Sequence, residues 1–164
     1  MLIRLLLLLA VVVGALLILA GQWGLLRGKV PTDLGVTDGK LKAPSQTENS
    51  VSSQASLYPN HPMQAYAQIA PLSYAGDAAV AWAKLERAVA TLPRTSVMTQ
   101  TASSSGRYLY LQSTTLLLRF TDDVEFWQDE ANHVIHVRSA SRLGRKDFGA
   151  NRKRVEAVRA AFNA

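Results

Sequence analysis

The sequence contains no cysteine in 164 residues. A chain without thiols cannot form a disulfide, bind a metal through thiolates or use a cysteine nucleophile. The patterns GxSxG, GxGxxG and the P-loop are also missing, so the sequence carries no signal for a nucleophile elbow or a nucleotide-binding loop. These absences exclude several enzyme classes, but they say nothing about the redox compartment.

Acidic residues are the minority charge, with 12 Asp and Glu against 18 Lys and Arg, a net charge of +6. The stretch from Arg138 to Arg159, RSASRLGRKDFGANRKRVEAVR, holds eight basic and two acidic residues, so its surplus equals that of the whole chain. A strongly basic balance indicates an anionic partner or surface, which could be lipid, nucleic acid or polysaccharide.

The N-terminus is a long apolar run. Leu5 to Gly21 carries no polar side chain, and Gln22 is the only interruption before Leu26. A helix over these residues would be roughly 33 Å long, enough for a hydrocarbon core of about 30 Å. The sequence therefore predicts a membrane anchor over 1–27, with the following domain on the periplasmic side. The alternative is a cleaved signal peptide with Ala20 at the −1 position.

The next segment, 28–64, is rich in Gly, Pro, Ser, Thr and Asp and has no hydrophobic periodicity, which predicts a linker and loop-built motif. After it, 65–70 could form a short edge strand between prolines.

Residues 65–164 are predicted to form an α+β domain. An apolar stripe at helical spacing, with Asp77 as its cap and Pro93 as its end, predicts a helix over 77–92. A second stripe predicts a helix over 149–162. Between them lie four predicted strands, at 94–102, 107–113, 115–127 and 133–140, with a turn at 103–106. Their short connections predict a two-layer fold, in which two helices cover one face of an antiparallel four-stranded meander.

Several motifs resemble a known family. DDVEF at 122–126, VRSASRLGRKDFGANRKRVEAV at 137–158, LGVTDGKLKAP at 34–44 and NSVSSQA at 49–55 are similar to those of the domain-of-unknown-function family 1499. Members of that family usually carry two cysteines in the N-terminal motif, where this chain has Ala43 and Ser50. The resemblance therefore implies a fold and a motif without a thiol function, and it implies no particular activity.

Strand periodicity separates the two adjacent carboxylates. Asp122 shares a face with Phe120 and Val124, on the core side, whereas Asp123 points the opposite way. Two carboxylates on opposite faces cannot act together as acid and base. An arginine of the RSASR or NRKR stretch is expected to pair with Asp122, so that Asp122→Ala would destabilise the domain far more than Asp123→Ala. The predicted structural polar network consists of Asp122, Asp123, Asp147 and Arg154, with Asp147 capping the last helix.

The same basic stretch offers donors for an anion, because glycines free the backbone, and hydroxyl and guanidinium groups lie near a helix N-terminus. The predicted anion cradle consists of Arg138, Ser139, Ser141, Arg142, Asn151 and Arg152. The alternative is a capped turn with solvated arginines. His133 and His136 face opposite ways on a strand, so no metal site and no cofactor are predicted.

The sequence thus predicts a membrane-anchored, envelope-facing domain that binds or scaffolds, with an anionic small molecule or a lipid head group as its ligand. The alternative is an enzyme that acts on a phosphorylated or lipid envelope substrate. Nucleic acid is disfavoured as a partner, because the anchor and the lack of aromatics in the basic stretch count against it.

Overall fold

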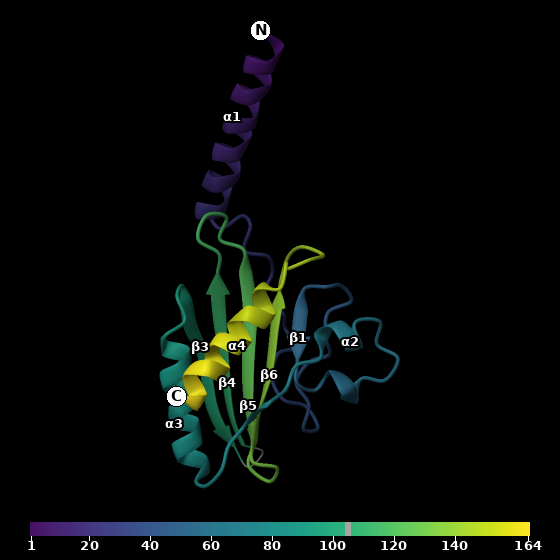
Figure 1. Ribbon diagram of the computed structural model, residues 1–164, viewed down its shortest axis with the longest axis vertical. Coiled ribbons are helices and arrows are strands. Elements are labelled where there is room, and N and C mark those ends of the chain that lie inside the picture. The colour runs from purple at the N-terminus through teal and green to yellow at the C-terminus, as the bar shows by residue number, and fades with distance from the viewer. Residues whose placement is uncertain (104–105) are drawn as a thin grey trace.

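The computed structural model describes residues 1–103 and 106–164 (Figure 1). Of the turn predicted at 103–106, Ser104 and Ser105 lie outside the described residues. Helices and strands follow one another in the order α1 (Leu2–Gln22), β1 (Ser50–Ser52), the 3-10 helix η1 (Ala55–Leu57), α2 (Gln64–Ala67), β2 (Leu72–Ser73), α3 (Ala78–Ala90), β3 (Thr95–Ser103), β4 (Gly106–Thr114), β5 (Thr121–Asp129), β6 (Val134–Ser141) and α4 (Ala150–Asn163).

Both long helices of the domain follow from local sequence. The Asp77 carboxylate accepts a hydrogen bond from the Val80 amide at 2.9 Å and so caps α3. Trp82, Leu85 and Val89 are the buried stripe of that helix. Before α4, Gly149 has a φ of +79°, a left-handed conformation that glycine adopts without strain.

The strands form one antiparallel sheet in the order β1-β6-β5-β4-β3, and β2 also pairs with β6. The meander of β3 to β6 and the α+β class are as predicted. The described residues hold six strands rather than four, because β1 and β2 extend the sheet beyond β6. The edge strand expected at 65–70 is instead the short helix α2, followed by a bridge from Gln68 to Ser52. Alanines at 65 and 67 favour this helical turn.

Helices α3 and α4 cover one face of the sheet (Figure 1). We call it the helix face, and its buried strand residues include Leu109, Leu111, Val124, Phe126 and Val137. These side chains and the stripes of the two helices make the hydrophobic core, which is the main source of stability in such a layered fold.

The opposite face, which we call the loop face, is covered by the segment that precedes β1. The Gly35 amide donates to Glu125 at 2.8 Å, Arg138 donates to the Ala43 carbonyl at 3.2 Å, and Leu41 is buried. Hydrophobic periodicity does not predict the position of this segment, because its residues are held by backbone and side-chain hydrogen bonds rather than by an apolar stripe. The segment shields the side chains of the loop face from solvent, so both faces of the sheet are buried.

Helix α1 extends away from the domain (Figure 1). It is long and apolar enough to cross a membrane by length and composition, a test that an N-terminal signal sequence would also pass. The residues of its apolar window are not buried inside the protein.

Candidate functional site: ion pairs on both faces and a basic cleft

Strand β5 carries three carboxylates that alternate between the faces of the sheet. Asp122 faces the helices and lies 2.6 Å from the Arg154 guanidinium, whereas Asp123 and Glu125 face the loop segment. All three carboxylates are buried. Each therefore needs a partner, because an unpaired buried charge is costly.

On the helix face, a hydrogen-bond network joins the end of β6 to the start of α4. The Ser139 hydroxyl donates to the Asn151 side chain at 2.6 Å, and Arg154 donates to both Ser139 at 3.0 Å and Asn151 at 2.8 Å. The Asn151 amide group donates to the Ser141 hydroxyl and to the Asn49 carbonyl, each at 3.0 Å. Ser139 and Asn151 are fully buried, so their side-chain polar atoms form hydrogen bonds with other residues of the protein and not with solvent.

Asp147 holds the start of α4. Its carboxylate accepts from the Asn151 amide at 3.0 Å, the Gly149 amide at 2.9 Å and the Tyr66 hydroxyl at 2.8 Å. Burial pushes the pKa of this carboxyl upward, but the hydrogen bonds from Gly149, Tyr66 and Asn151 outweigh it and hold the pKa below the usual value. Burial and the bond to Asp147 raise the pKa of Tyr66 to about 12. Gly149 is the N-cap of α4, and the Asp147 carboxylate, two residues before it, accepts from backbone amides of the first turn.

On the loop face, Arg142 and Asp123 form a two-point ion pair. Arg142 Nε donates to Asp123 at 2.9 Å, and Arg142 Nη2 donates to it at 2.7 Å. The Tyr110 hydroxyl donates to the same carboxylate at 2.6 Å. The hydrogen bonds to Asp123 raise the pKa of the Arg142 guanidinium, although burial acts against it. This planar pairing fixes the orientation of the guanidinium.

A second pair lies beside the first. Arg138 Nη1 donates to Glu125 at 3.2 Å, and the Tyr108 hydroxyl donates to the same carboxylate at 2.9 Å. Burial and the neighbouring Glu125 charge raise the pKa of Tyr108, which keeps the phenol protonated. Arg138, in β6, and Arg142, which directly follows that strand, therefore both lie on the loop face, each held by a carboxylate and a tyrosine.

Between this face and the covering segment lies a cleft of about 410 Å³. We call it the basic cleft, defined by Lys29 and Lys42 of the segment and by Asp123, Arg138 and Arg142 of the sheet. Prolines 31 and 44 and residues Ala43, Ser45, Gln46, Ala140 and Ser141 complete its lining. Lys42 also pairs with Asp33 at 2.5 Å. Within the described residues, Lys29 has no ion-pair partner.

The structure does not bring the six residues of the predicted anion cradle together. Arg138 and Arg142 face the basic cleft, whereas Ser139 and Asn151 lie on the other side of the sheet. Ser141 lines the cleft, but its hydroxyl belongs to the helix-face network. Arg152 donates to the carbonyls of Gln68 at 3.0 Å and Tyr66 at 2.6 Å. The division has a simple cause, since neighbouring residues of a strand point to opposite faces.

Sequence reasoning missed the residues that complete the loop face. Tyr108 and Tyr110 alternate with buried leucines, and Glu125 shares the phase of Asp123, so strand periodicity could have found these three. Lys29 and Lys42 carry no such signal, because they come from a segment without regular structure.

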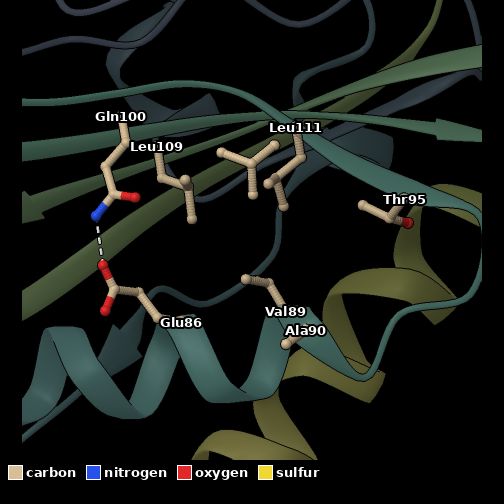
Figure 2. A pocket seen from close by; sticks show the side chains of 8 residues that line it. Glu86, Val89, Ala90, Thr95, Gln100, Leu109 and Leu111 are labelled. Atoms are coloured by element: carbon tan, nitrogen blue, oxygen red, sulfur yellow. Dashed lines mark hydrogen bonds between the residues drawn. The ribbon is translucent and has the colours of Figure 1, made fainter.

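A separate hollow of about 320 Å³ lies between α3 and strands β3 and β4 (Figure 2). Its walls are mainly apolar, with Val89, Leu109 and Leu111 pointing into it, and Gln100 donates to Glu86 at its rim. None of its lining residues is basic. The hollow therefore offers no positive charge to bind an anion.

His136 lies on the loop face but takes part in neither of the two arginine–carboxylate pairs there. His136 stacks on Trp127 with ring centroids 5.3 Å apart, and its Nδ1 lies 3.2 Å from the Ser53 hydroxyl. Burial lowers the pKa of His136, and the charge of Asp129 opposes that effect only in part. In the described ranges, no group of three His, Asp or Glu side chains is placed to hold a metal ion.

Fold and site together define an α+β domain behind an apolar N-terminal helix, with buried arginine–carboxylate pairs on both faces of its sheet. The chain belongs to the family described as "Protein of unknown function (DUF1499)", whose model matches residues 40–162. This match confirms the resemblance carried by the motifs. No curated protein and no solved structure matches the chain.

Proposed function

We propose that this protein is a membrane-anchored, envelope-facing binding domain that holds an anionic group in the basic cleft. The observation that carries the proposal is the convergence of Lys29, Lys42, Arg138 and Arg142 on one cleft. Asp33, Asp123 and Glu125 neutralise three of these four cations. Among the residues that the structure describes, the Lys29 charge is therefore left without a carboxylate partner.

The two arginines support the proposal through their geometry. Their carboxylate and tyrosine partners hold them rigid, so little side-chain entropy is lost when a ligand binds. In the part of the chain that the structure describes, no hydrogen bond involves Arg138 Nη2 or Arg142 Nη1. These two groups and the Lys29 ammonium are the donors available to an anion. A cleft of about 410 Å³ has the size of a small-ligand site.

The position of the cleft favours a ligand with a phosphate-like group. A Cβ added at Gly28 would lie 2.8 Å from the Arg142 Cβ, so the chain reaches the cleft only a few residues after α1 ends at Gln22. A phospholipid head group and a free phosphate are both within reach there. An N-terminal anchor with a short basic start normally leaves the rest of the chain outside the cytoplasm, which supports the envelope-facing orientation.

The test is thermal unfolding of the full chain in detergent, with phosphate, sulfate, a short-chain phosphatidylglycerol or a short-chain phosphatidylcholine added. We expect stabilisation by mass action, about 2.7 kcal/mol at a ligand concentration 100 times the Kd. Lys29→Gln with Lys42→Gln should abolish the shift, because both lysines are removed while the buried arginine pairs stay intact. A response to phosphatidylglycerol but not to free phosphate would identify a lipid ligand.

The matched control is Lys153→Gln, which removes an exposed cation of α4 outside the cleft. It should keep the full shift. Equal shifts in the wild type, the double variant and the control would show that general charge screening, and not the cleft, causes the effect, and would overturn the proposal.

A further inference from the structure

Two neighbouring leucines project into solvent at the turn between β4 and β5. Leu116 is 63% exposed and Leu117 is 58% exposed, although a leucine gains free energy by leaving water. The turn is bound to the end of α1: Gln22 Nε2 donates to the Leu117 carbonyl at 3.0 Å, and Arg119 Nε donates to Gln22 Oε1 at 3.2 Å. The turn that carries the leucines therefore lies beside the last turn of the apolar helix (Figure 1).

Gly21 shows how close this contact is. A Cβ at this position would lie 2.5 Å from the Leu118 carbonyl oxygen and 2.9 Å from its Cα, distances that no side chain could occupy. Only glycine lets the turn approach the helix backbone in this way. The contact between α1 and the domain thus depends on residues of both segments, the end of α1 and the β4–β5 turn.

The apolar surface continues past the helix. Trp23 is 78% exposed and Leu25 is 71% exposed, and both follow directly on α1. Together with Leu116 and Leu117 they form what we call the membrane-proximal patch. A cluster of large exposed apolar side chains at one end of a domain marks an interaction surface rather than random exposure.

The charges around the patch are of one sign. Arg27, Lys29 and Arg119 lie in the two segments that carry it, and neither 21–31 nor 115–121 contains an acidic residue. Tryptophan and leucine flanked by Arg and Lys are the residues that suit the boundary between acyl chains and anionic head groups. Because the patch is continuous with an apolar helix of membrane-spanning length, a lipid bilayer is the partner that fits it.

We propose that the β4–β5 turn inserts into the bilayer interface beside α1, as a second membrane contact of the domain. Two contacts fix the domain's orientation, whereas without the inserted turn α1 and the domain docked on it could tilt together relative to the bilayer. The insertion also places the basic cleft, a few residues further along the chain, at the level of the head groups. This inference does not depend on any ligand in the cleft.

The absence of native cysteine allows a direct test with the full chain. Leu117→Cys is labelled with an environment-sensitive fluorophore and reconstituted into vesicles of phosphatidylcholine and phosphatidylglycerol. The matched control is Ala131→Cys, in the exposed β5–β6 turn at the far end of the sheet. We expect the label at 117 to be quenched by a nitroxide on the upper acyl chain and protected from iodide, and the label at 131 to behave in the opposite way. Equal quenching of both labels by iodide would overturn the proposal.

A second variant tests the consequence for orientation. Leu116→Glu with Leu117→Glu changes only exposed side chains, so the domain keeps its fold and α1 keeps it in the membrane. Energy transfer from the label at 131 to acceptor lipids should then show a broader distance distribution than in the parent. An unchanged distribution would mean that the turn does not hold the domain. The phosphate-induced thermal shift in detergent tests the cleft alone, so the two proposals can fail separately.

Discussion

The two faces of the sheet are both buried, but by different means. The helix face is covered by α3 and α4, and apolar side chains such as Phe126 and Val124 fill the space, with one ion pair at its margin. The loop face is covered by an irregular segment over two arginine–carboxylate pairs. Hydrophobic burial on the first face accounts for stability, whereas a buried ion pair adds little net stability and is suited to fixing the position of a group. The basic cleft thus lies on the face where burying charged groups costs desolvation free energy.

The largest expected effects come from breaking an ion pair on either face. Asp122→Ala and Asp123→Ala should each cost roughly 3–5 kcal/mol in unfolding free energy, because the first leaves the largely buried Arg154 guanidinium and the second the buried Arg142 guanidinium without its partner. The sequence predicts a much larger effect at Asp122, because Asp122 points to the core side and Asp123 to the opposite face. The structure gives the two variants similar expected effects, since the opposite face is covered as well and Asp123 is only 1% exposed. Urea melts of the two variants decide the matter: a small effect at Asp123 alone would show that the loop face is open to water.

A smaller effect is expected from the hydrogen-bond network of the helix face. Ser139→Ala should cost about 1–3 kcal/mol, because Asn151 and Arg154 each lose a buried partner. The same change at Ser96, an exposed residue of β3, should stay within about 0.5 kcal/mol. Equal urea midpoints for the two variants would mean that water replaces the lost hydroxyl.

The smallest effect concerns pH and the loop face, where His136 stacks on Trp127. Because burial lowers the pKa of His136 in the folded state, the unfolded chain binds the proton more readily, and stability should fall as the pH drops below about 6.5. The unfolding free energy of the parent should therefore fall between pH 7 and pH 5, and this slope should be smaller in His136→Gln. The exposed His133→Gln serves as the control and should keep it. Identical slopes in both variants would assign the pH dependence to other groups.

Local sequence was sufficient for those features that depend on a residue's near neighbours. The apolar run predicts α1, the stripe between Asp77 and Pro93 predicts α3, and the alternation along β5 separates Asp122 from Asp123. All three rest on periodicity or on capping, which act within a few residues and leave a regular pattern.

Tertiary structure alone decided the rest. Strand β1 has three residues, too few for any period, and it forms because β6 offers it a free edge. Arg154 rather than another arginine pairs with Asp122, a choice set by how α4 lies across the sheet. The residues of the predicted anion cradle are separated because Arg138 and Ser139, neighbours in β6, point to opposite faces of the sheet. Lys29 and Lys42 join the cleft through a segment whose path depends on distant partners, Glu125 and Arg138 among them. Contacts between residues far apart in the chain leave no local pattern, because their free energy depends on the assembled fold.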